Sequence, residues 1–242
     1  MQDKVSYAGK DLEAMSFARN YHQWILDVFR PYLGKRLVEV GAGTGSFSEL
    51  LADQGARSIS LVEPSGTMFQ VLQDRIPQFP ATIEFNLYNA LFEDVFDQIR
   101  MTQHPDSIIY VNVIEHIDDD QRELKIVWRT LDAGGRVFIF VPAFQWLYGN
   151  FDKGVGHFRR YTKAELESKC RDAGFKILKS TYFDLMGVLP WWIQYRLLRA
   201  STLKPGAVKF YDSYLVSITK AFESLVAPPF GKNLLVIGER IG

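Results

Sequence analysis

A short apolar run that ends in an acid and then in a glycine-rich turn constrains this chain more than any other feature. The run, residues 36–40, is rich in aliphatic and β-branched side chains, as in a fully buried parallel strand. The apolar residues that follow, Phe47, Leu50 and Leu51, recur at helical spacing. Glycine occupies three of the five positions 41–45, so the backbone there can adopt positive φ and approach a ligand closely. The pattern predicts a strand, a turn that holds a nucleotide-type ligand, and a helix.

The spacing of the glycines separates the kinds of ligand site. A dinucleotide fingerprint needs its third glycine where Ser46 stands, and no Gly-Lys-Ser/Thr of a P-loop follows. What remains is E-x-G-x-G-x-G, formed by Glu39, Gly41, Gly43 and Gly45. This pattern resembles motif I of class I S-adenosylmethionine (SAM) dependent methyltransferases, and the resemblance implies that these four residues bind SAM. A tight turn without a ligand is the alternative that the motif alone leaves open.

Strand-like and helix-like stretches alternate along the chain. Strands are expected at residues 36–40, 58–62, 82–87, 107–112, 136–141, 175–182 and 234–240. The resemblance implies an α/β, Rossmann-like sheet of seven strands in the order 3-2-1-4-5-7-6, with the last strand antiparallel and helices on both faces. We expect a single domain, 1–242, with a helical N-terminal cap at 1–33 and a helical insertion at 184–232 between strands six and seven.

Polar residues stand at the ends of three expected strands, where open α/β sheets bind ligands. Glu63 ends the second strand, at the place from which a carboxylate accepts both hydroxyls of an adenosine ribose. Asn89 follows the third strand, where the resembled family usually has an aspartate for the adenine amino group, and Asp94 competes for this role. Asn112 ends the fourth strand. We assign Glu63, Asn89 and Asn112 to SAM binding.

The loop after the fourth strand raises the question of a metal. Glu115, His116 and the acids that follow them resemble a loop of small-molecule methyltransferases. Some quinone-type relatives bind a divalent ion in this loop through acids and a histidine. Three positions before Glu115, however, stands Asn112 rather than a second acid. We therefore expect no metal.

A long stretch without periodicity, 143–160, is rich in polar and aromatic residues, and such loops in compact domains are more often functional than not. Methyl transfer from a sulfonium needs a well-placed nucleophile and a proton acceptor. Histidine titrates near pH ~6.5, which suits a proton acceptor and makes His157 the candidate base. A structural hydrogen bond from His157 to Asp152 or Tyr161 is the alternative.

Substrate contacts are expected from the same loop and from aromatic residues elsewhere. An arginine pair in the loop either grips an anionic substrate or anchors the loop, because guanidinium groups suit carboxylate and phosphate. The residues assigned to substrate binding are Tyr21, Trp146, Arg159, Tyr161 and Trp191.

The insertion at 184–232 holds more tryptophan, tyrosine and phenylalanine than a surface connector needs. We expect two helices, split by Lys204-Pro205-Gly206, that form a lid over an apolar or amphipathic acceptor. A homodimer interface and peripheral contact with a membrane are ranked second and third. Added core over the sheet edge is the remaining alternative.

Composition narrows the class of partner. Lys plus Arg and Asp plus Glu number 28 each, and without a basic excess a nucleic-acid partner is disfavoured. The single cysteine, Cys170, is typical of a reducing compartment. The sequence shows neither a signal peptide nor an apolar run of transmembrane length, so a cytoplasmic protein is expected.

Two further segments carry a more specific resemblance. GHFRRYTKAEL at 156–166 and PPFGKNLLVIGER at 228–240 are similar to a bacterial, type 11/12-like subgroup of class I methyltransferases from lipid, glycan or secondary-metabolite pathways. The resemblance implies SAM-dependent methyl transfer to an oxygen or nitrogen, less often a carbon, of a small or lipid-like acceptor. A nicotinamide-dependent oxidoreductase and a non-catalytic SAM-binding protein are the alternatives.

Overall fold

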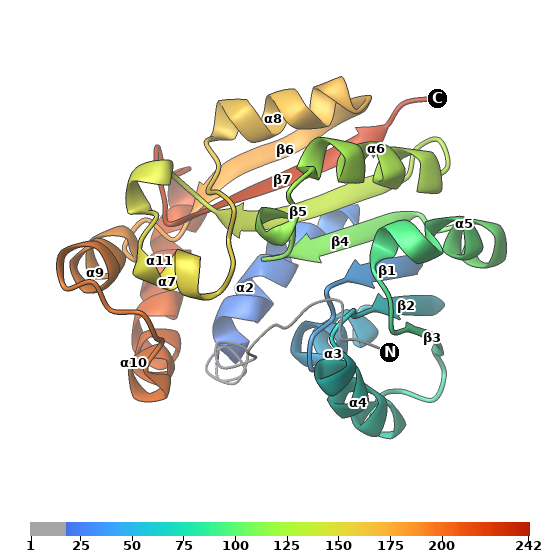
Figure 1. The fold of residues 1–242 in the computed structure, drawn as a ribbon, viewed down its shortest axis with the longest axis horizontal. Helices are drawn as coiled ribbons and strands as arrows, with labels where there is room; N and C mark the ends of the chain where they lie inside the picture. Colours follow the sequence, from blue (N-terminus) through green and yellow to red (C-terminus); the bar gives the residue numbers. More distant parts are fainter. Residues whose placement is uncertain (1–17) are drawn as a thin grey trace.

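One mixed sheet forms the centre of the computed structural model, which describes residues 18–242 (Figure 1). Its order is β3-β2-β1-β4-β5-β7-β6, and β7 pairs antiparallel with both neighbours. The expected α/β fold, the strand order and the antiparallel last strand are therefore confirmed. The strands are β1 (Arg36–Val40), β2 (Ser58–Val62), β3 (Glu84–Tyr88), β4 (Ser107–Val111), β5 (Arg136–Pro142), β6 (Phe175–Phe183) and β7 (Asn233–Arg240).

Several strand ends differ from the expected ones by one or two residues, and two of these differences have a visible local reason. The third strand begins at Glu84 rather than at residue 82, because the N–H of Ile83 donates to the carbonyl of Pro80 and closes a turn there. The fourth strand ends at Val111, because Asn112 leaves the extended conformation with φ +55°.

Helices cover both faces of the sheet. Figure 1 shows α5, α6 and α8 on one face and α2, α3 and α4 on the other. Asp119 and Thr162 cap α6 and α8, each through a side-chain oxygen that accepts a backbone N–H of the first turn. The helices are α2 (Arg19–Phe29), α3 (Ser46–Ala52), α4 (Gly66–Arg75), α5 (Phe92–Gln103), α6 (Asp120–Thr130), α7 (Asn150–Gly154), α8 (Lys163–Asp172), α9 (Val188–Trp191), α10 (Pro205–Phe210) and α11 (Val216–Leu225).

Each strand contributes to two cores because its side chains alternate between the faces. Along β5, Phe138 and Phe140 pack in the core beneath α2 and α3, whereas Val137 and Ile139 pack beneath α6 and α8. Burial on both faces explains why the parallel strands read as nearly continuous apolar runs. The helix α2 docks through Trp24, whose ring centroid lies 3.8 Å from that of Phe183. Residues 1–17 of the expected N-terminal cap lie outside the described part of the chain.

The insertion leaves β6 and returns to β7 at the same edge of the sheet. Since β7 is antiparallel to β5, its first residue lies opposite Pro142, at the carboxyl end of the parallel strands. Figure 1 shows α7, α9, α10 and α11 gathered beyond this edge. Before Pro205 the insertion contains α9 and a π-helical segment (Trp192–Leu197). From Pro205 onward it contains α10, a second π segment (Tyr211–Leu215) and α11. None of the described helices has the length and hydropathy needed to cross a membrane.

The aromatic contact between the sheet and α2 gives a stability prediction. Phe138 is fully buried, and its ring centroid lies 5.1 Å from that of Phe29. Phe138→Ala should lower the free energy of unfolding in urea by about 3 to 5 kcal/mol, since it leaves a cavity between two rigid elements. Val71→Ala on the exposed side of α4 is the control and should change it by less than about 0.5 kcal/mol. Equal effects of the two variants would contradict this packing.

Candidate functional site

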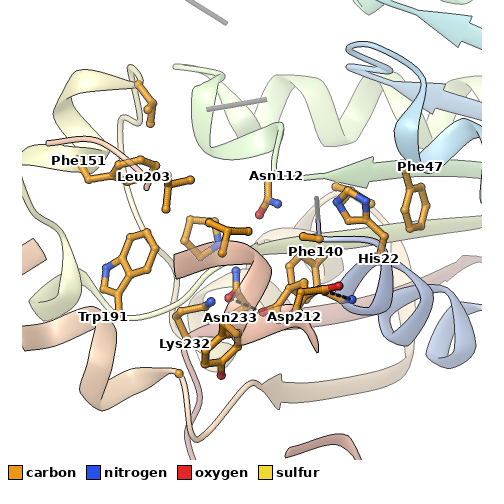
Figure 2. A pocket seen from close by; sticks show the side chains of 18 of the residues that line it. His22, Phe47, Asn112, Phe140, Phe151, Trp191, Leu203, Asp212, Lys232 and Asn233 are labelled. Carbon is orange, nitrogen blue, oxygen red and sulfur yellow. Dashed lines mark hydrogen bonds between the residues drawn. The ribbon is translucent and has the colours of Figure 1, made fainter. Parts of the chain in front are cut away.

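A cavity of about 510 Å³ opens at the carboxyl edge of the sheet, between the glycine turn, α2 and the insertion. Figure 2 shows His22 and Phe47 at one end of it and Phe151, Trp191 and Leu203 at the other. Between the two ends lie Asn112, Phe140, Lys232 and Asn233. The cavity therefore has a glycine-turn end and an apolar end, joined without an intervening wall.

The glycine turn has the geometry that its sequence predicts. Gly41, Gly43 and Gly45 all adopt positive φ, at 72°, 56° and 81°. A Cβ on Gly41 would lie 2.4 Å from Cγ2 of Val113, so this position has room for glycine alone. Its N–H donates to the carbonyl of Val62 at 2.8 Å, which ties the turn to the end of β2. Gly41 and Gly43 line the cavity, whereas Gly45 lies behind the turn at the start of α3.

The acid of the motif, Glu39, also lines the cavity and is almost fully buried. Its carboxylate accepts a hydrogen bond from the hydroxyl of Ser48. Burial raises the pKa of Glu39 to about 8, and the charge of Glu63 adds to the shift. A cation that enters this end of the cavity would stabilise the ionised carboxylate.

Glu63 and Asn89 lie together behind the turn. The carboxylate of Glu63 accepts the N–H groups of Gly43 and Ser65, each at 2.8 Å, and the amide of Asn89 donates to the Glu63 carbonyl at 2.8 Å. Burial raises the pKa of Glu63, although these two backbone bonds oppose the shift. Neither side chain lines the cavity. Each carboxylate oxygen of Glu63 nevertheless keeps an acceptor site beyond the bond it makes. Both assignments stay predictions.

His157 lines the cavity and is held by a buried acid. Its Nδ1 lies 2.9 Å from Oδ1 of Asp152. The same Oδ1 accepts a hydrogen bond from Nε of Arg160 at 2.7 Å, and Oδ2 accepts one from the N–H of Gly149 at 2.8 Å. Burial acts to raise the pKa of Asp152, but the bond from His157 and the charge of Arg160 lower it overall. An ionised Asp152 accepts the proton of Nδ1, which leaves Nε2 as the nitrogen that can take up another.

A second buried acid faces Nε2 of His157. Oε1 of Glu115 lies 3.8 Å from it, and neither carboxylate oxygen of Glu115 has a hydrogen-bond partner within the described residues. Burial raises the pKa of Glu115 to about 7, against the opposing charge of His157, and lowers that of His116 to about 3. Ligand atoms of Glu115, His116 and His157 lie within 4.8 Å of one another, and imidazole with carboxylate is a set that metals accept. The expectation of no metal stays a prediction.

An ion pair with a buried acid contributes Lys232 to the cavity wall. Nζ of Lys232 lies 2.8 Å from Oδ2 of the fully buried Asp184. The same ammonium stands 5.0, 5.4 and 5.5 Å from the ring centroids of Tyr21, Tyr211 and Trp191. The hydroxyls of Tyr21 and Tyr211 both donate to Asp184. The wall thus presents an ammonium group that is paired with a carboxylate and surrounded by aromatic rings.

The structure brings only some of the assigned substrate residues to the cavity. Tyr21 and Trp191 line it. Trp146 does not, since 48% of it is exposed to solvent away from the cavity lining. Arg159 is occupied by an ion pair with Asp120 at 2.9 Å, and the buried hydroxyl of Tyr161 donates to the same acid at 2.8 Å. These two residues anchor the loop beneath the cavity in this structure.

The sequence reading overlooked Lys232 and Asn233, which line the cavity from the start of β7. A signal for them existed. Two polar residues precede an otherwise apolar strand, and an antiparallel last strand must begin at the edge where its parallel neighbours end. The two therefore had to lie at the ligand-binding edge.

Comparison with known proteins identifies the family. The description "Methyltransferase domain" matches residues 11–180. The chain belongs to this family. The resemblance to class I SAM-dependent methyltransferases that the glycine motif carries is thereby confirmed.

Named relatives and solved structures agree with the family. The ubiquinone biosynthesis O-methyltransferase of Pseudomonas savastanoi pv. phaseolicola is 23% identical over 157 residues, which are 60% of this chain and 66% of that protein. This is slightly less than two thirds of the relative's length. A SAM-dependent methyltransferase structure from Archaeoglobus fulgidus superposes with a TM-score of 0.61 at 15% identity, covering 92% and 94% of the two chains. One from Mesorhizobium loti reaches 0.55 at 15% identity, covering 88% and 96%. At these identities the structures show the shared fold alone.

The buried ion pair of Asp152 and Arg160, which orients His157, gives a second prediction. Asp152→Asn leaves the buried Arg160 without its counter-charge, so the free energy of unfolding near neutral pH should fall by about 3 kcal/mol or more. The stabilisation comes from a lowered acid pKa, so it is present above the ordinary aspartate pKa and is lost as the pH falls through the lower folded-state value. Asp118→Asn, with 82% of its side chain exposed, is the control. Matching unfolding curves for the two variants would contradict the role of the pair.

Proposed function

We propose that this protein transfers the methyl group of SAM to an oxygen or nitrogen, less often a carbon, of a small apolar or amphipathic acceptor. One observation carries the proposal: a single cavity joins the glycine turn and Glu39 to an end lined by Phe151, Trp191 and Leu203. A cofactor at the first end and an acceptor at the second would meet inside the same cavity.

The residues at the glycine-turn end fit SAM chemically. SAM carries an ammonium and a sulfonium, and Glu39 is a buried acid whose one hydrogen-bond donor within the described residues is Ser48. A positive group beside Glu39 would supply the missing counter-charge. Glu63 would accept the ribose hydroxyls, Asn89 the adenine amino group, and Asn112 would face the cofactor from the end of β4. When bound, SAM supplies a methyl group on a leaving group that is already activated.

The acceptor end favours a flat apolar body with a polar substituent. Aromatic rings of Phe151, Trp191 and Tyr195 pack edge to face or tilted against one another, with centroids 4.3 to 5.2 Å apart. Asn233 and the ammonium of Lys232 offer donors at its border. The relatives named ubiquinone biosynthesis O-methyltransferases support oxygen as the nucleophile. A secondary metabolite or a lipid or glycan precursor has this chemistry.

His157 would act as the proton acceptor. The acceptor's oxygen or nitrogen would bond to the methyl carbon as the methyl–sulfur bond breaks, and the proton of this nucleophile would pass to Nε2 of His157. Asp152 would hold the imidazole in the required tautomer and stabilise the imidazolium. Glu115, 3.8 Å from Nε2, would add to that stabilisation in its ionised form.

Two other functions use the same fold. A nicotinamide-dependent oxidoreductase would place a pyrophosphate at the start of α3, where Ser46 stands in the position of the third glycine and Glu39 adds an acid. A non-catalytic protein would bind SAM without using His157. Binding of ligands separates the first from our proposal, and turnover separates the second.

Calorimetry with SAM, S-adenosylhomocysteine, NAD and NADP tests the ligand class. We expect the two adenosyl ligands to bind and the two dinucleotides not to bind. The ammonium of S-adenosylhomocysteine favours ionised Glu39, so binding should release a proton, and the affinity should rise between about pH 6 and pH 8 by at most tenfold per pH unit. Tight binding of NAD or NADP without the adenosyl ligands would falsify the proposal.

Two buried acids provide the matched variants for this experiment. Glu39→Gln should weaken binding and remove the proton release. Glu123→Gln is the control, because Glu123 is buried in the other core, where Tyr110 donates to it at 2.6 Å, and does not line the cavity. If Glu39→Gln binds S-adenosylhomocysteine with unchanged affinity and pH dependence, Glu39 does not contact the ammonium.

The role of His157 is tested by turnover. With an acceptor found by incubating cell extract with isotopically labelled SAM, His157→Ala should lower the rate at saturating substrate roughly a hundredfold or more and leave SAM affinity nearly unchanged. His104→Ala, on an exposed histidine distant from the cavity lining, should leave the rate unchanged. An unaltered rate in the His157 variant would reassign that residue to structure.

A further inference from the structure

The insertion carries most of the exposed apolar surface of the molecule. Among the described residues, 18 large apolar side chains are exposed, and 13 of them lie between residues 184 and 232. Leu225 and Leu198 are the most exposed of these, at 84% and 71%. Scattered apolar residues are normal on a protein surface, but such a concentration on one segment indicates a surface that contacts something apolar.

The helix that runs through α10, the π segment 211–215 and α11 is amphipathic with an apolar side facing outward. Phe210, Tyr214, Ile218 and Phe222 follow one another at intervals of four residues and are all exposed. The opposite side is buried through Asp212, Val216 and Thr219. A helix on the surface of a globular protein normally turns its apolar stripe inward and its polar residues outward. Here a second apolar stripe remains uncovered.

The acidic and basic residues of the insertion differ in their exposure to solvent. Its acids face inward: Asp184 and Asp212 are buried, and Glu223 accepts the backbone N–H groups of Asp184 and Leu185. Lys220 pairs with Asp27 of α2, and Lys232 pairs with Asp184. The remaining basic residues, Arg196, Arg199, Lys204 and Lys209, are exposed. The exposed, outer surface of the insertion therefore carries apolar side chains and basic residues, whereas its acids are buried or paired.

We propose that this outer side of the insertion rests on the surface of an anionic lipid bilayer. Apolar side chains that reach the acyl boundary and basic residues at the level of the headgroups are the combination by which interfacial helices bind. A second copy of the chain is less suited to it, because two such faces would bring like charges together. The inference does not depend on the proposed reaction.

The position of this face relative to the cavity gives the contact a use. Phe210 is exposed on the outer stripe and also lines the cavity. Leu203 and Val208 of the same segment line the cavity too. The helices that would lie on the bilayer are thus the walls of the acceptor end. An amphipathic acceptor dissolved in the bilayer would reach the cavity along an apolar path without crossing water.

Co-sedimentation of the full chain with vesicles tests the inference. The protein should sediment with vesicles of phosphatidylcholine mixed with phosphatidylglycerol, less with phosphatidylcholine alone, and less at high salt, which screens the headgroup charge. Ile218→Ser with Phe222→Ser removes part of the stripe, and Lys204→Gln with Lys209→Gln removes charge. Each pair should weaken binding to the anionic vesicles roughly tenfold or more.

Matched control variants lie elsewhere on the surface. Met101→Ser on α5 and Lys125→Gln on α6 also remove an exposed apolar and an exposed basic residue and should bind like the wild type. Thermal unfolding of all variants checks that they fold, and binding of S-adenosylhomocysteine should be unaffected. The inference is overturned if the wild type stays in the supernatant with anionic vesicles, or if both double variants bind as it does. It is also overturned if sedimentation velocity shows a dimer that the apolar pair dissociates while vesicle binding is absent.

Discussion

The ion pair between Asp184 and Lys232 holds together three segments that are distant in sequence. Asp184 is fully buried, so its charge depends on the ammonium of Lys232 and on the hydroxyls of Tyr21 and Tyr211. These partners come from α2, from the middle of the insertion and from the residue before β7. Loss of any one would leave a buried charge less compensated. The cavity wall, α2 and the insertion are therefore joined through one carboxylate.

The sequence predicted the elements whose cause is local. β1 and β2 have the expected bounds because a strand buried on both faces is an apolar run between turn residues. The short helix α7 was not expected within the loop at 143–160. Five residues are too few to show a helical period, and α7 depends on the bond from the N–H of Gly149 to Asp152. Its stability comes from the contacts of Asp152 with Arg160 and His157, which a search for helical periodicity does not show.

The site also combines features that local sequence predicts with features that depend on tertiary packing. The positive φ of the glycines and the presence of Glu39 and His157 at the cavity follow from motif spacing and from the edge at which loops leave a sheet. The place of Arg159 does not, because a guanidinium suits a substrate anion and a structural carboxylate equally well. Asp120, about forty residues earlier in the chain, decides between them, and only the packing of α6 against the loop brings the two together.

Burial sets the charge of the ionisable groups at the cavity and thereby the kind of ligand that suits them. It pushes Glu39 and Glu115 toward their neutral acids and His22 and His116 toward neutral imidazoles, with pKa values of about 8, 7, 4 and 3. The stronger charges nearby, those of Arg160 and Lys232, are matched by Asp152 and Asp184. A cation arriving at Glu39 converts a neutral acid into its own counter-charge. An anionic pyrophosphate would instead face a group whose ionisation opposes it, so the electrostatics of this end favour a cationic ligand over a dinucleotide.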